Sequence, residues 1–174
     1  PSLGADKSYR EWEVGSYAEI AKSIFEKTNW IGLICGTEKE SHLGEQIQKI
    51  CDAQLEIYAG RTTLQELAWL LSKSKILISN ETGTAHISSA VGTPTVCILG
   101  GGHFGRFAPY PALPGQTNFF NAVFHKMPCY GCNWVCIFPI IEGEPTPCIA
   151  NISVDAVWKQ VRPLLTSCPY TDFL

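Results

Sequence analysis

The chain has 174 residues, of which 45% are hydrophobic and 17% charged, as in an ordinary globular domain that buries its own core. Its formal charge of -3, with no basic run, argues against a nucleic-acid-binding surface. No apolar stretch approaches the ~20 residues that a membrane-spanning helix needs. Because the chain starts at Pro1 without a methionine, we expect it to be a piece of a longer protein.

Short apolar runs alternate with segments of helical periodicity along most of the chain. The opening residues, 1–12, are predicted to form a polar loop. The predicted strands are 30–35, 55–58, 75–79, 95–99 and 121–125. The predicted helices are 17–25, 38–51, 64–72, 83–91 and 154–165, with Thr63 as the N-cap of the third. This alternation predicts one α/β domain over 1–174 with a mostly parallel sheet and right-handed crossovers.

The regular alternation stops after the strand at 95–99. A run of three glycines opens a segment, 100–106, that we expect to be a flexible loop, and a proline-rich stretch follows at 109–115. A cysteine-rich excursion at 128–148 precedes the last helix.

The segment that joins the third and fourth strands has the most informative sequence, Ser-Asn-Glu-Thr-Gly-Thr-Ala-His over 79–86. It leaves the carboxyl end of a strand and opens a helix. The first amides of a helix lack internal partners and its dipole favours negative charge, so such a turn in a parallel α/β domain binds anions. A nucleotide sugar fits this arrangement, with its diphosphate on the helix start and a carboxylate and an imidazole beside it.

The same segment resembles the signature of glycosyltransferase family 9, the ADP-heptose:lipopolysaccharide heptosyltransferases, in its run Asn-Glu-Thr-Gly-Thr-Ala-His-Ile-Ser-Ser-Ala-Val-Gly-Thr-Pro-Thr-Val. Four further stretches agree with the family in order along the chain. They are Gly4-Ala5 with Arg10-Glu11-Trp12, Gly36-Thr37-Glu38-Lys39-Glu40, Gly60-Arg61-Thr62-Thr63-Leu64 with Glu66-Leu67-Ala68, and the cysteine group. The family pattern has Asp where this chain has Glu81, one methylene longer, so the donor pose or the sugar is expected to differ.

The resemblance implies a Rossmann-like parallel sheet flanked by helices, the C-terminal half of a GT-B glycosyltransferase. It implies that the first strand of the domain, expected just before Pro1, and the whole N-terminal acceptor domain are absent from this chain. The general base, usually an Asp of the acceptor domain, is then absent too, so no catalytic residue is assigned here.

The resemblance also implies the residues that bind the donor: Gly4, Ala5, Arg10, Glu40, Thr62, Glu81, Thr82, Gly83 and His86. Thr82 and Gly83 would contact the diphosphate, His86 would donate to it, and Glu81 would orient hydroxyls of the sugar. Each has a structural alternative: an ordinary N-cap at Thr82, a structural imidazole at His86, and an acidic residue that favours a helix start at Glu81.

The remaining assignments concern loops and helix starts. Arg10, with Lys7 nearby, would neutralise the departing diphosphate without a metal, or would be a solvated loop charge. Glu40, with Glu38 as its rival, would meet the ribose, and Thr62 would lie near the adenine. The backbone amides of Gly4 and Ala5 would reach phosphate, and Arg106 is left unassigned.

Four cysteines crowd into the excursion: Cys129, Cys132, Cys136 and Cys148. They could hold a structural zinc or iron in tetrahedral thiolate geometry, with no open position for catalysis. The alternatives are reduced thiols packed among aromatic side chains and disulfides formed after purification.

The sequence therefore predicts the donor-binding domain of an inverting glycosyltransferase that moves heptose from ADP-heptose to a lipopolysaccharide core acceptor. No cofactor is required, and the parent is expected in the cytoplasm, peripheral to the inner membrane face. The alternatives are a GT-B transferase with another nucleotide sugar or a protein acceptor, and a nucleotide-binding module without catalysis.

Overall fold

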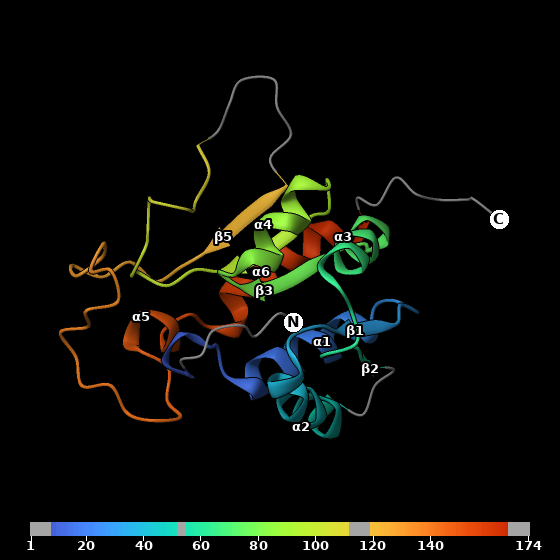
Figure 1. The fold of residues 1–174 in the computed structure, drawn as a ribbon, viewed down its shortest axis with the longest axis horizontal. Helices are drawn as coiled ribbons and strands as arrows, with labels where there is room; N and C mark the ends of the chain where they lie inside the picture. The colour runs from blue at the N-terminus through green and yellow to red at the C-terminus, as the bar shows by residue number, and fades with distance from the viewer. Residues whose placement is uncertain (1–7, 52–54, 112–118, 167–174) are drawn as a thin grey trace.

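The computed structural model describes residues 8–51, 55–111 and 119–166 (Figure 1). Short strands alternate with helices as the periodicity predicts, and the helices end within a few residues of the expected positions. The elements are η1 Ser8–Arg10, α1 Val14–Phe25, β1 Gly32–Ile34, η2 Glu38–Glu40, α2 Ser41–Cys51, β2 Leu55–Ile57, α3 Leu64–Lys73, β3 Leu77–Asn80, α4 Gly83–Ala90, β4 Thr95–Ile98, β5 Phe120–Val123, α5 Pro147–Ala150 and α6 Val154–Thr166.

All the strand pairs are parallel, which confirms the α/β fold with parallel strands. The strands form two hydrogen-bonded groups, β1-β2 and β3-β4-β5, where the sequence suggested one sheet. Figure 1 shows the first group beside α1 and α2, and β3 and β5 in a separate group near α4 and α6. In the described part of the chain, β1 and β3 do not pair with each other.

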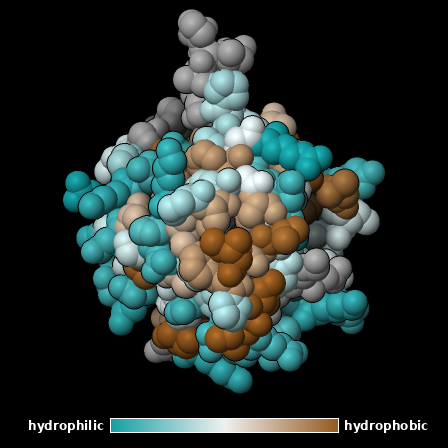
Figure 2. Space-filling model, turned by 90° about the vertical axis from the view of Figure 1, so that its left-hand side faces the viewer, coloured by the Kyte–Doolittle hydropathy of each residue, from teal (hydrophilic) through white to brown (hydrophobic). Residues whose placement is uncertain are grey.

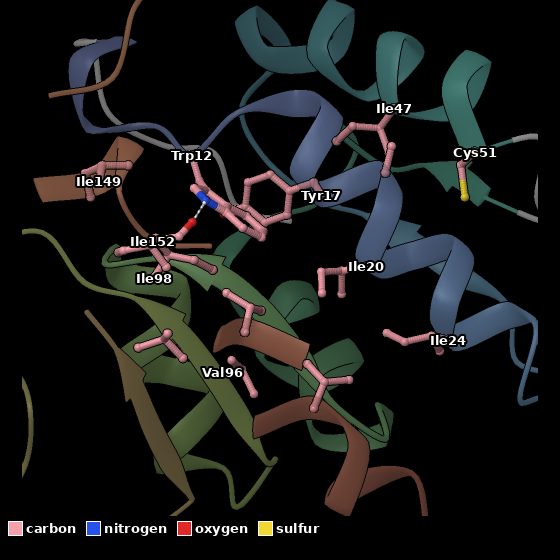
Figure 3. Close-up of a cluster of buried hydrophobic side chains, with 14 of the residues drawn as sticks. Trp12, Tyr17, Ile20, Ile24, Ile47, Cys51, Val96, Ile98, Ile149 and Ile152 are labelled. Atoms are coloured by element: carbon pink, nitrogen blue, oxygen red, sulfur yellow. Dashed lines mark hydrogen bonds between the residues drawn. The ribbon is translucent and has the colours of Figure 1, made fainter. Parts of the chain in front are cut away.

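One hydrophobic core joins the two groups of strands (Figure 3). Ile20 of α1 and Ile47 of α2 belong to the same buried cluster as Val96 of β4 and Val157 of α6. Trp12 ties the cluster together, because its indole Nε1 donates to the carbonyl of Ile152 at 2.8 Å. A buried indole that finds such an acceptor adds its large apolar area to the core without an unsatisfied donor.

Helix starts follow the local chemistry of the sequence. Thr63 caps α3 as predicted: its Oγ1 accepts from the amide of Glu66 at 3.3 Å, and the Glu66 carboxylate accepts from the amide of Thr63 at 2.7 Å. The predicted helix 38–51 begins instead as the 3-10 turn η2, where Thr37 and Glu40 form a capping box. Periodicity does not detect η1 or α5, because elements of three and four residues show no repeat.

The glycine run at 100–102 is buried, so the prediction of a flexible loop is wrong for these residues. The amide of Gly131 donates to the carbonyl of Gly101 at 2.8 Å, and that of Asn133 to Gly102 at 2.9 Å. A Cβ atom at Gly102 would lie 2.3 Å from the indole of Trp134. The glycines are therefore required for close packing of the cysteine-rich excursion rather than for mobility.

The excursion also exposes apolar side chains, which gather on the face shown in Figure 2. Its exposed apolar residues are Val135, Ile137, Phe138, Ile140 and Ile141. No helix in the described part of the chain has both the length and the apolar character that crossing a bilayer demands.

Candidate functional site

The candidate site is a cavity of about 210 Å³ at the carboxyl ends of β3 and β4. In open parallel sheets this is the edge at which ligands bind, because the crossover loops and helix starts meet there. The cavity brings together five of the residues predicted from the sequence: Arg10, Glu81, Thr82, Gly83 and His86. It is also lined by Asn80, Ile98, Gly100, His103, Phe107, Trp134 and Ile149.

The start of α4 forms the floor of this cavity. Thr82 is the N-cap in extended conformation, with φ -142° and ψ 171°, and its side chain makes no capping hydrogen bond to the helix. A Cβ atom built on Gly83 would meet no atom within 4 Å, so the space above the first turn is open. The geometry leaves the helix start accessible to an anion, as the strand-turn-helix pattern predicts.

Glu81 lies between β3 and α4 with its amide donating to the carbonyl of Ile98 at 3.1 Å. Burial raises the pKa of its carboxyl group to about 7, and the positive charge of Arg10 opposes this shift only in part. Near neutral pH, the Glu81 carboxyl is therefore present in two forms: protonated, when it can donate a hydrogen bond, and ionised, when it can only accept one.

Arg10 approaches the cavity from η1 and packs against aromatic rings. Its guanidinium carbon lies 4.5 Å from the ring centroid of Trp134 and 5.5 Å from that of Tyr9. Its buried Nε has no hydrogen-bond partner among the described residues. An arginine that packs on aromatic faces can still donate its N–H groups to a ligand. It is therefore better suited to bind an anion than an arginine already paired with a carboxylate.

His86 lies one turn into α4 on the side of the cavity. Its Nδ1 is hydrogen-bonded to the hydroxyl of Tyr110 at 2.5 Å, and its ring stacks on Phe120 with a centroid distance of 5.8 Å. Burial lowers the pKa of the imidazole, so the ring is neutral at neutral pH. Burial raises the pKa of Tyr110, which therefore keeps its proton.

Two predicted donor residues lie outside the cavity. Glu40 is buried beside the end of β1, where its Oε2 accepts from the amide and hydroxyl of Thr37 at 2.6 and 2.7 Å. Its other oxygen, Oε1, is buried without a hydrogen-bond partner in the described part of the chain. Thr62 is partly exposed in the turn before α3. The two turns are adjacent, because the amide of Gly60 donates to the carbonyl of Gly36 at 2.9 Å.

The other predicted residues fall into two groups. Gly4, Ala5 and Lys7 lie outside the described residues. Arg106 is exposed, and its guanidinium carbon lies 5.0 Å from the ring centroid of Phe107. It is not among the residues that line the cavity. Glu38 is exposed at the start of η2 and does not line it either.

Among the lining residues that sequence reasoning missed are four polar or aromatic side chains: Asn80, His103, Phe107 and Trp134. Asn80 accepts from the amide of Trp12 at 3.1 Å through Oδ1, while its buried Nδ2 has no partner among the described residues. Asn80 is the last residue of β3, and its position at the carboxyl end of a predicted strand could have marked it as a candidate site residue. Trp134 gave no such signal, because it lies in the irregular cysteine-rich excursion, which follows β5 and has no periodicity that would place it beside the end of β3.

The four thiols of the excursion are not gathered into a metal site. Cys129, Cys132, Cys136 and Cys148 are free cysteines, and the described residues contain no group of three or more metal-ligating side chains. Cys148 is buried, and its Sγ accepts from the amide of Gly101 at 3.4 Å.

The fold is that of a Rossmann-like α/β domain of GT-B glycosyltransferases, as solved structures show. The chain superposes on the structure of E. coli ADP-heptose lps heptosyltransferase II with a TM-score of 0.68 and 18% sequence identity. The superposition covers 94% of this chain and 45% of that one. A glycosyl transferase family 9 structure from Veillonella parvula gives a TM-score of 0.69 and 20% identity, covering 94% and 44%.

Sequence comparison then identifies the family. The model of glycosyltransferase family 9 (heptosyltransferase) matches residues 2–132, and the chain belongs to this family. Lipopolysaccharide core heptosyltransferase OpsX of Haemophilus influenzae is 31% identical over 119 residues, 67% of this chain and 34% of that protein. Lipopolysaccharide heptosyltransferase 2 of Salmonella typhimurium is 25% identical over 95 residues, 52% and 27% respectively. The chain thus spans about a third of the length of these relatives.

Proposed function

We propose that this chain is the donor-binding domain of an inverting glycosyltransferase that transfers heptose from ADP-heptose to a lipopolysaccharide core acceptor. One observation carries the proposal: Arg10, Glu81, His86 and the open start of α4 line a single cavity. Membership in a family of heptosyltransferases supports the sugar and the acceptor. The rest of the parent protein would supply the acceptor site and the general base, at the cytoplasmic face of the inner membrane.

The reaction is a single displacement at the anomeric carbon. The acceptor oxygen bonds to this carbon as the bond to the β-phosphate oxygen breaks, the base takes the acceptor proton, and the electron pair leaves with ADP. The negative charge that develops on the diphosphate would be stabilised by the amides at Gly83 and by the guanidinium of Arg10. Donors fixed in advance at that position act on the transition state without reorganisation.

His86 would supply a further donor to the same charge. Tyr110 keeps its proton, so its hydroxyl can donate to Nδ1 of the neutral imidazole. In this tautomer the other nitrogen, Nε2, carries a hydrogen and can donate to a phosphate oxygen. Glu81 would meet the hydroxyls of the sugar, and its greater length compared with Asp would set the pose of the donor.

A nucleotide screen tests this proposal. We expect ADP to raise the melting temperature of the chain, with no comparable effect of UDP or GDP. His86→Ala should weaken ADP binding about tenfold, the effect of one hydrogen bond to a charged group. His125→Ala is the matched control, since His125 is exposed and outside the cavity.

Other outcomes separate the alternatives. A preference for UDP or GDP would indicate a transferase with another donor, and no response to any nucleotide would indicate that the cavity is not a donor site. Unchanged ADP affinity in His86→Ala would remove His86 from the site. We expect the chain alone not to transfer heptose, since the proposal places the general base and the acceptor site in the rest of the parent protein. Heptose transfer by the isolated chain would contradict this placement.

A further inference from the structure

The candidate cavity contains a second imidazole, which has no role in the reaction proposed above. His103, in the loop after β4, lines the same cavity as Arg10 and Gly83. Its ring meets those of Phe107 and Trp134 nearly at right angles, with centroid distances of 5.3 and 6.2 Å. The side chain makes no hydrogen bond within the described part of the chain. Both ring nitrogens can therefore serve a ligand.

The position of His103 is fixed by the structure around it. The two residues that precede it, Gly101 and Gly102, are buried, and their carbonyls accept hydrogen bonds from the cysteine-rich excursion. The carbonyl of His103 accepts from the amide of Arg106 at 2.9 Å. Because the loop is held at these points and the ring lies against two aromatic side chains, the imidazole would lose little conformational freedom when a ligand binds.

The charged groups near His103 come from three segments. Arg106 belongs to its own loop and Arg10 to η1, while Glu81 and His86 line the same cavity from the turn after β3 and from α4. The excursion contacts the ring through an uncharged indole. Partial burial, and then the positive charges of Arg10 and Arg106, lower the pKa of the His103 imidazole. The ring is therefore neutral at neutral pH when the cavity holds no anion.

A diphosphate at the start of α4 would reverse the electrostatic part of this effect. The cavity of about 210 Å³ is narrower than the Debye length of about 10 Å at 0.1 M salt, so charges within it act on one another with little screening. Negative charge nearby favours the imidazolium, which carries a hydrogen on both ring nitrogens. His103 would then take up one proton from solvent and donate a charge-assisted hydrogen bond to the ligand.

We propose that His103 is a further diphosphate-binding residue of this cavity and that it binds the ligand as an imidazolium. The two histidines then act differently. His86, hydrogen-bonded to Tyr110, would donate in its neutral form, whereas His103 supplies a positive charge only while the diphosphate is bound. Its proton returns to solvent when ADP leaves, so a permanent second cation does not oppose product release. This inference rests on the proposed function, because it concerns the diphosphate of the donor.

Proton NMR of the imidazole rings tests the inference on the 174-residue chain, which has four histidines. His103→Phe identifies the signal of His103 by its loss and keeps an aromatic ring against Phe107 and Trp134. The signals are titrated between about pH 5 and pH 8, the range in which histidine changes charge. Three samples are compared: the free chain, the chain with saturating ADP and the chain with saturating pyrophosphate.

We expect each ligand to raise the titration midpoint of His103 by about one pH unit. By linkage, this rise means that the imidazolium binds the ligand about tenfold more tightly than the neutral ring, as expected for one hydrogen bond to a charged group. The exposed His125, outside the cavity, is the reference whose midpoint should stay constant. Because Glu81 titrates near neutral pH, the measurement is repeated in Glu81→Gln, where the rise should persist.

The outcomes separate this inference from the proposed function. An unchanged midpoint in a chain that binds ADP would overturn the inference alone. A rise with pyrophosphate without any binding of ADP would support the role of His103 and contradict the nucleotide of the proposed function. A chain that binds neither ligand would contradict both. A rise that disappears in Glu81→Gln would also overturn the inference, since His103 would then respond to that carboxyl group rather than to the diphosphate.

Discussion

Glu81 is the residue in the cavity whose charge depends most on its surroundings. Its carboxyl group loses water on burial while the cation of Arg10 compensates incompletely, so its pKa rises from 4.5 to about 7. The folded chain then binds more protons than the unfolded chain between these two values. Stability contributed by this group is therefore present at low pH and is lost as the pH rises from 4.5 to 7.

The first prediction concerns the variant Glu81→Gln. Gln is neutral at every pH, so the melting temperature of the variant should exceed that of the native chain at pH 8, and the difference should shrink toward pH 5. Thermal unfolding followed across this range measures it. Glu66 is an opposite-sign control, because hydrogen bonds from Thr63 lower its pKa; Glu66→Gln should destabilise the chain near neutral pH. A difference for Glu81→Gln that is constant with pH would refute the assignment.

At the scale of the element, the cysteine-rich excursion completes the wall of the candidate site. Tyr130 and Trp134 pack on the glycines that follow β4, and Trp134 has φ +63°, a left-handed conformation that costs energy for a large side chain. The same indole covers the guanidinium of Arg10. The excursion thus links the loop after β4 to η1 across the cavity.

The second prediction is that Trp134→Ala weakens ADP binding about fivefold to tenfold, because Arg10 loses a cation–π contact of about 1 kcal/mol and its fixed position. Trp69→Ala is the matched control, since Trp69 is exposed on α3. Isothermal titration of both variants with ADP, after circular dichroism has shown that they are folded, measures the effect. Equal affinities in the two variants would remove Trp134 from the site.

At the scale of the molecule, the two groups of strands share a core without sharing a hydrogen-bonded edge. Residues of α1 and α2 belong to the same buried cluster as Val157 and Val161 of α6, which are fully buried. Burial of apolar area does not depend on direction, so it can couple the two groups even though no backbone ladder joins β1 to β3 among the described residues.

The third prediction is that Val157→Ala lowers the free energy of unfolding by about 2 kcal/mol, from two lost methyl groups and the cavity that they leave. Both groups of strands should unfold together. Urea unfolding followed by far-ultraviolet circular dichroism and by tryptophan fluorescence should give coincident transitions. Separate transitions would show that the shared core does not make the chain one cooperative unit.

Much of the fold and part of the site follow from local sequence patterns. The spacing of apolar residues and caps such as Thr63 place the longer helices, and the strand-turn-helix segment brings Glu81, Thr82, Gly83 and His86 together because they lie within two helical turns. The short elements η1 and α5 were not predicted, because three or four residues show no periodicity. The role of the glycines after β4 escapes because it depends on side chains about thirty residues away.

By itself, the sequence determined the alternation of strands and helices, the parallel direction of the strands and the strand-turn-helix segment that leads into α4. These properties depend on residues near one another in the chain, so spacing and side-chain chemistry are sufficient. Only the tertiary structure decided that Trp134 covers Arg10, that burial raises the pKa of Glu81 to about 7, and that β1 and β3 belong to separate groups of strands. Each of these depends on which distant surfaces exclude water from one another, and periodicity carries no information about that.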